Sequence, residues 1–186
     1  MQLRLHAFLP CSRANGPGKR AVLWVQGCSL DCPGCFNPGT HALEGGQNVA
    51  VEEFFQRIVD LGPAIEGVTL SGGEPLQQRS AVTELLARVR EETNLSVIVF
   101  TGFTWAEVLA MEKSARLLRC VDVLIAGRYD ATQRLAQSLR GSANKTVHFL
   151  SNRYGLADFE AIPEAEIVIA PDGELRASGI APLRLG

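Results

Sequence analysis

Apolar residues along the chain form two kinds of run. Short continuous runs are typical of strands covered on both faces, because such strands show no polar alternation. They lie at residues 22–26, 68–70, 95–100 and 121–126. Weak alternation over residues 3–9 predicts an edge strand. Residues 147–150, 165–170 and 175–177 also have strand patterns, with a hairpin turn at residues 171–174.

Between the continuous runs, apolar residues recur every three or four positions, which is the spacing of a helix with one buried face. These segments are residues 51–61, 81–92 and 105–113. Gly62-Pro63 ends the first helix, and Thr104 is suited to cap the start of the third.

Alternating strands and helices predict an α/β fold with a mostly parallel sheet, whose functional residues lie at the carboxyl ends of the strands. Only about four to five strand–helix units fit in the chain, too few to close an eight-stranded barrel. We therefore expect an open partial (β/α) barrel. A single domain is expected over residues 1–186, with its core at about 20–150 and a C-terminal strand and hairpin extension at 151–186.

Three cysteines follow the first continuous apolar run with the spacing C-x3-C-x2-C: Cys28, Cys32 and Cys35. Three thiolates on a short loop suit a soft metal centre, and three ligands to a four-iron cluster leave one iron free for another ligand. Structural zinc is an alternative that needs a fourth ligand, for which His41 is the nearest candidate. The spacing favours an iron–sulfur cluster over zinc, and zinc over a disulfide framework.

A second motif, Ser71-Gly72-Gly73-Glu74-Pro75, follows the next apolar run. Paired glycines allow close approach to the backbone, whose amides and carbonyls can bind a small zwitterion. An ordinary Gly-Gly turn closed by proline is the alternative interpretation of this segment alone.

Together the two motifs resemble the radical S-adenosylmethionine (SAM) superfamily. Three segments more closely resemble the small activases of glycyl radical enzymes, a group that includes those of anaerobic ribonucleotide reductases. They are Gly16-Pro17-Gly18-Lys19-Arg20, Gln26-Gly27-Cys28 and Pro33-Gly34-Cys35-Phe36-Asn37-Pro38. The resemblance covers residues 1–150, and it implies a radical SAM fold and an oxidoreductase activity.

The resemblance implies that Cys28, Cys32 and Cys35 hold a [4Fe–4S] cluster and that SAM binds the fourth iron. Reductive cleavage of SAM would give a 5′-deoxyadenosyl radical, which abstracts hydrogen from a glycine of a partner glycyl radical enzyme. The electron would come from a reductant such as flavodoxin or ferredoxin. A different protein or peptide substrate is one alternative, and a non-catalytic iron–sulfur or zinc protein is another.

The resemblance also implies a set of cofactor contacts. The loop that contains Gly72, Gly73, Glu74 and Pro75 would hold the amino group of SAM, with Glu74 shaping the loop. Phe36 would pack beside the adenine or shield the cluster. Asn37 and Thr101 would lie near the cofactor.

Several other positions carry open alternatives. Asp122 would contact the cofactor or cap a strand at the surface, and Arg140 would pair with the SAM carboxylate or a partner loop, or lie in a polar turn. Lys19 and Arg20 would bind an anion or be exposed. Ala126 occupies a position where these activases usually have an acid, which puts the role of that acid in doubt.

Composition supports a compact chain: 186 residues with 46% hydrophobic content are enough for one core. A net charge of −2 predicts binding neither to nucleic acid nor to an anionic membrane surface. The chain begins with no secretion-signal pattern and has no apolar run long enough to span a bilayer, so we expect a cytoplasmic protein. Five cysteines, with Cys11 and Cys120 outside the motif, also suit a reducing compartment.

Overall fold

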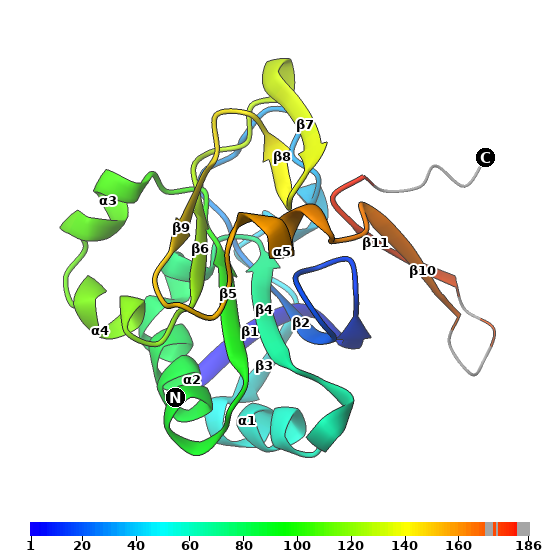
Figure 1. Cartoon of the computed structure of the whole chain (residues 1–186). Helices are drawn as coiled ribbons and strands as arrows, with labels where there is room; N and C mark the ends of the chain where they lie inside the picture. Colours follow the sequence, from blue (N-terminus) through cyan, green and yellow to red (C-terminus); the bar gives the residue numbers. More distant parts are fainter. Residues whose placement is uncertain (170–172, 174, 182–186) are drawn as a thin grey trace.

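The computed structural model describes residues 1–169, 173 and 175–181, and its main element is a seven-stranded sheet (Figure 1). The strand order is β3-β1-β2-β4-β5-β6-β9. Strands β2, β4, β5 and β6 are parallel, whereas β1, β3 and β9 run antiparallel to their neighbours. The predicted α/β class with a parallel centre is confirmed. The strands are β1 (Gln2–Ser12), β2 (Arg20–Val25), β3 (Gln47–Ala50), β4 (Gly67–Gly72), β5 (Ser96–Phe100), β6 (Val123–Ala126) and β9 (Thr146–Phe149).

The first strand is not an edge strand, so that prediction was wrong. Strand β3 pairs with it on the side opposite β2, with Leu3 facing Val49 in the register. Residues 47 and 48 are Gln and Asn, so β3 has no apolar run that would reveal a strand in the sequence. The edge is β3 itself.

Four helices pack against one face of the sheet (Figure 1). They are α1 (Val51–Val59), α2 (Arg79–Glu92), α3 (Trp105–Ala110) and α4 (Ser114–Leu118). Phe54, Ile58 and Leu85 from the first two helices are fully buried in one apolar core with strand residues Leu23 and Leu70. Burying this face stabilises the sheet and leaves the opposite face for other groups.

The start of α3 confirms the predicted cap. Thr104 Oγ1 accepts a hydrogen bond from Glu107 N, and the Glu107 carboxylate accepts one from Thr104 N at 2.7 Å. This reciprocal pair satisfies two backbone amides that the first turn leaves without partners.

On the other face of the sheet, Arg20 is fully buried, so it is neither an exposed cation nor an anion site. Its Nε donates to Thr69 Oγ1 at 2.7 Å, Nη2 donates to Val68 O at 2.7 Å, and Nη1 donates to Ser96 Oγ at 2.9 Å. Burial lowers the pKa of the guanidinium, which nevertheless stays protonated at neutral pH. Arg20 therefore ties together the N-terminal parts of three parallel strands, β2, β4 and β5.

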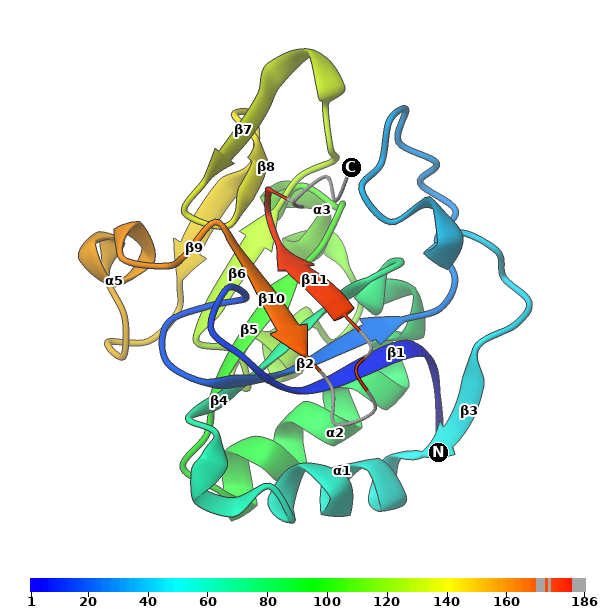
Figure 2. The same cartoon turned by 90° about the vertical axis from the view of Figure 1, so that its right-hand side faces the viewer.

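The last part of the chain lies on the same side as Arg20. Helix α5 (Leu156–Glu160) buries Phe159 against β5 and β6. Strands β7 (Arg134–Gln137) and β8 (Arg140–Ser142) form one small sheet, and β10 (Ala165–Ile169) and β11 (Leu175–Gly179) form another. Figure 2 shows the β10–β11 hairpin in front of β1 and β2.

The predicted strands at the C-terminus are confirmed as far as the described residues reach. Residue 170 and residues 171, 172 and 174 of the predicted turn lie outside them. None of the helices in the described part of the chain has the length and apolar content needed to cross a membrane.

Candidate metal and cofactor site

The cysteine loop leaves the end of β2 and returns beside its own start. Gly27 N donates to Thr40 O at 2.8 Å, and Cys28 N donates to His41 O at 3.0 Å. Gly27 has a φ of +103°, a conformation that side chains with a Cβ rarely adopt. These bonds close the loop and hold it at the carboxyl end of a parallel strand.

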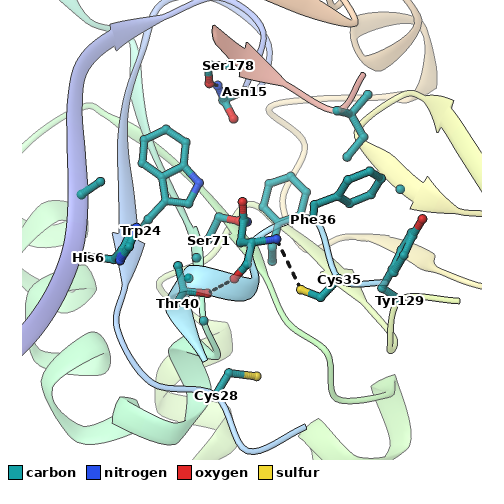
Figure 3. Close-up of a pocket in the computed structure, with 18 of the residues that line it drawn as sticks. His6, Asn15, Trp24, Cys28, Cys35, Phe36, Thr40, Ser71, Tyr129 and Ser178 are labelled. Carbon is teal, nitrogen blue, oxygen red and sulfur yellow. Dashed lines mark hydrogen bonds between the residues drawn. The ribbon is translucent and has the colours of Figure 1, made fainter. Parts of the chain in front are cut away.

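Within the loop, a tight turn brings the second and third cysteines together. Cys35 N donates to Cys32 O at 3.1 Å, and Gly34 between them has a φ of +71°. The backbone N–H of Asn37 donates to Cys35 Sγ at 3.5 Å, which favours a negatively charged sulfur. A dashed line at Cys35 in Figure 3 marks this bond. Cys28, Cys32 and Cys35 are all free thiols and all half-buried. Burial raises the pKa of the Cys28 thiol.

The Gly72-Gly73-Glu74 loop is locked to the cysteine loop through its backbone. Gly73 N donates to Val25 O at 2.8 Å, and Glu74 N donates to Gly27 O at 2.9 Å. A Cβ on Gly73 would lie 2.3 Å from Gly27 O, too close for any side chain. The two motifs of the sequence therefore form one rigid unit.

Glu74 is buried and anchors this unit to the next strand. Its Oε1 accepts from Leu76 N and from Thr101 Oγ1, both at 2.8 Å, and its Oε2 accepts from Gly102 N at 2.7 Å. Burial raises the pKa of this carboxyl group, while the three donors lower it. An ionised carboxylate can accept all three hydrogen bonds. Because the donors come from the segments after β4 and β5, Glu74 joins these two loops.

We expect Thr101→Val to lower the free energy of unfolding by about 2 kcal/mol, because a buried carboxylate loses a charge-assisted hydrogen bond. Anaerobic urea unfolding would measure this change. Thr83→Val, at a buried threonine of α2 outside the pocket lining, controls for the substitution itself. Equal losses in the two variants would contradict the anchoring role of Glu74.

A cavity of about 780 Å³ opens at the carboxyl ends of the parallel strands. This volume is within the usual range for small-molecule and cofactor pockets. Nine of the twelve residues predicted for the site line it: Cys28, Cys32, Cys35, Phe36, Asn37, Gly72, Gly73, Glu74 and Thr101.

The other three predicted residues are not among those that line the cavity. Pro75 is buried at the start of the short 3-10 helix that follows Glu74. Asp122 precedes β6, at the end of the strand away from the cavity, and its carboxylate accepts from Val97 N at 2.8 Å and Ser151 Oγ at 2.6 Å. Arg140 lies on β8 opposite Gln137. Asp122 is thus a buried structural group, and neither a cofactor contact nor a surface cap.

Ala126, which stands where related activases usually have an acid, is fully buried in the apolar core that the helices cover. An acid at this position would place its charge among apolar side chains unless the backbone moved. The missing acid therefore leaves the described cavity lining unchanged.

Sequence reasoning missed several residues that line the cavity, among them Tyr129 and Lys145. The rings of Tyr129 and Phe36 are in contact, with centroids 4.6 Å apart (Figure 3). Both Phe36 and Tyr129 thus form one wall, a position that suits either stacking on adenine or shielding a cluster. Tyr129 follows the carboxyl end of β6, so the rule that sites gather at strand ends would have found it.

Lys145 brings a positive charge to the cavity. Its Nζ donates to Gly127 O, and the acidic groups that act on its charge are Cys32, Cys35 and Glu74. Burial lowers the pKa of the ammonium, while these three acidic groups raise it. A cation at this place offsets the negative charge of thiolates and can bind an anionic ligand group.

The donor set fits a cluster together with an organic ligand. Three free thiols face a cavity that is far larger than an ion, and the loop beside them exposes backbone amides and carbonyls at two glycines. In the part of the chain that is described, no three His, Cys, Asp or Glu side chains converge closely enough to hold a single metal ion.

Three free cysteines at the carboxyl end of a parallel strand, beside a large cavity, fit the class of iron–sulfur proteins. The chain belongs to the family of 4Fe-4S single cluster domains, whose model matches residues 14–148. It is a radical SAM protein, as the two motifs predicted, and its cofactors are a [4Fe–4S] cluster and SAM.

The chain is similar over most of its length to proteins named anaerobic ribonucleoside-triphosphate reductase-activating protein. The one from Vibrio cholerae is 35% identical over 153 residues, which are 78% of this chain and 97% of that protein. The one from phage T4 is 33% identical over 140 residues, covering 73% and 87%. Among solved structures, QueE from Escherichia coli matches 56% of this chain and 54% of its own, with 17% identity and a TM-score of 0.46.

Proposed function

We propose that this chain activates an anaerobic ribonucleoside-triphosphate reductase by forming a glycyl radical in it. The observation that supports this most strongly is the locked pair of loops, which faces three cysteines and two glycines into one cavity. Relatives that carry the activating name match this chain over 97–99% of their own length in three bacteria.

In this proposal, Cys28, Cys32 and Cys35 bind three irons of the cluster. Gly72 and Gly73 present backbone groups to the amino group of SAM, while Phe36 and Tyr129 form the wall against the nucleoside. When bound, the cluster supplies one electron to the sulfonium of SAM, and the fragment released takes a hydrogen atom from the Cα of a glycine. The protein fixes the orientation and excludes water.

Lys145 takes the role that the sequence suggested for Arg140. Arg140 is outside the cavity lining, whereas Lys145 lines the cavity, and burial lowers the pKa of its ammonium while Cys32 and Cys35 raise it. We infer that its ammonium binds the carboxylate of SAM. A charged hydrogen bond of this kind contributes about 1.5–3 kcal/mol.

Lys145→Gln is expected to weaken SAM binding by about tenfold or more. Titration of SAM into the reconstituted protein, followed by calorimetry and by the spectrum of the reduced cluster, would measure it. Lys113→Gln, at an exposed lysine before α4, should leave the affinity unchanged. A Lys145 variant that binds SAM as tightly as the wild type would show that the carboxylate has another partner.

Two further features complete the proposal. The sheet is an open partial barrel of the radical SAM type, and residues 1–186 form a single domain. The electron donor is a small redox protein such as flavodoxin or ferredoxin.

The test is to mix the reconstituted protein anaerobically with a reductase of the same organism, SAM and reductant, and to record the electron paramagnetic resonance spectrum. A glycyl radical doublet on the reductase supports the proposal, and a reductase with its radical glycine changed to alanine is the control. Cleavage of SAM without a radical on the reductase would point to a different protein substrate.

A further inference from the structure

The β10–β11 hairpin lies outside the part of the chain that matches its family. The family match ends at residue 148, whereas β10 begins at Ala165. The Vibrio cholerae relative is matched over 97% of its length by 78% of this chain. The hairpin also forms its own two-stranded sheet, separate from the main sheet.

One face of the hairpin carries polar side chains that are hydrogen-bonded to the body of the protein. Ser178 Oγ accepts from Asn15 Nδ2 at 2.6 Å, and Glu166 Oε2 accepts from Arg13 N at 2.9 Å. Glu166 and Ser178 are cross-strand partners, so both lie on this face. Asn15 and Ser178 line the cavity, at the end away from Cys28 (Figure 3). The hairpin is therefore a wall of the cofactor cavity.

The other face of the hairpin is apolar and exposed. Ile169 pairs with Leu175, and Ile167 lies two residues before Ile169, so the three side chains share a face. Their exposed fractions are 44% for Ile167, 71% for Ile169 and 53% for Leu175. These are three of the eight large hydrophobic side chains that are exposed among the described residues. A contiguous exposed group of this kind marks an interaction surface more often than scattered single residues do.

We propose that this apolar face, made of Ile167, Ile169 and Leu175, docks the partner enzyme whose glycine enters the cavity. The inference rests on the proposed function. The choice of occupant follows from continuity: Ala177 pairs with Ile167, shares its face and lines the cavity, so a protein that inserts a segment there passes directly beside this face. A small-molecule substrate held in the cavity would leave the outer face uncovered.

The test is the triple variant Ile167→Thr, Ile169→Thr, Leu175→Thr, because threonine keeps the strand preference and removes apolar area. Glycyl radical formation is measured against the concentration of reductase, alongside the iron content and the SAM cleavage that occurs without reductase. We expect the half-saturating reductase concentration to rise about tenfold or more, which corresponds to 1.4 kcal/mol. Iron content and partner-free SAM cleavage should not change.

Leu156→Thr is the matched control, since Leu156 is 71% exposed on α5 and does not line the cavity. It should leave the half-saturating concentration unchanged. If the triple variant loses iron, Ile169→Lys tests the same face with one substitution and should raise the half-saturating concentration alone.

The outcomes separate the two proposals. If the wild-type protein forms the radical and the triple variant has the same half-saturating reductase concentration, the docking inference is overturned and the proposed function stands. A change from dimer to monomer in sedimentation with the same dependence on reductase would assign the face to a second copy, and would also overturn it. A wild-type protein that forms no radical on the reductase fails the proposed function instead.

Discussion

Cys32→Ala is expected to abolish the cluster and SAM cleavage with it. Four-ligand zinc sites bind with about 10–16 kcal/mol, so one thiolate contributes about 2.5–4 kcal/mol, or roughly a hundredfold to a thousandfold in affinity. Cys32 is one of only three cysteines in the cavity lining among the described residues. Anaerobic reconstitution, with iron and sulfide analysis and assay of 5′-deoxyadenosine, measures both effects.

Cys11→Ala is the matched control, because Cys11 is an exposed free thiol and does not line the cavity. It should retain the full cluster and full SAM cleavage. Retention of a SAM-responsive cluster in the Cys32 variant would contradict the assignment of the three cysteine ligands.

Gly73→Ala is expected to lower SAM cleavage by about a hundredfold, the size of effect that a shift of about 1 Å in a positioned group can cause. The added Cβ would lie 2.3 Å from Gly27 O and 3.0 Å from Thr40 O. Both are backbone atoms of the cysteine loop, so neither can rotate away. The two loops must therefore separate, and SAM binding falls with cleavage.

Cleavage rate and SAM affinity of the Gly73 variant should be measured at matched iron content. Gly155→Ala is the control, since a Cβ there meets no atom within 4 Å. Normal SAM affinity in the Gly73 variant would show that the junction of the two loops tolerates extra volume, and that it does not position the cofactor.

The cavity was largely predictable because its motifs follow parallel strands. Cys28 and Gly72 each lie at the end of an apolar run, and parallel strands place their carboxyl ends at one edge of the sheet. The same rule argues against Asp122, which precedes its strand, and for Tyr129, which follows that strand. Resemblance alone suggested Asp122, and the strand direction places it at the opposite end.

Other features depend on contacts that a sequence pattern does not contain. Arg20 can be buried because Thr69 and Ser96, from two other strands, accept its hydrogen bonds. The pattern of apolar residues along the chain does not indicate that these three polar side chains are in contact. The charge at the cavity comes from Lys145, five residues beyond the predicted Arg140, because the segment between them turns after β8. Long-range packing decided both positions.

The C-terminal hairpin shows the same limit. The strand patterns at residues 165–170 and 175–177, with a turn between them, predict a hairpin, and the structure pairs residues 165–169 with 175–179. Their place against Asn15 depends on single hydrogen bonds between side chains far apart in the chain. The sequence pattern therefore indicates the element, whereas its role as a cavity wall emerges only from the structure.

We propose above that SAM is cleaved in this cavity and that a hydrogen atom is taken from a glycine of the reductase. The most direct measurement uses reductase that carries α-deuterated glycine, with mass analysis of the 5′-deoxyadenosine formed. We expect deuterium to appear in the 5′-deoxyadenosine at the same rate as the glycyl radical forms on the reductase. Unlabelled 5′-deoxyadenosine, formed at the same rate with no radical on the reductase, would contradict it.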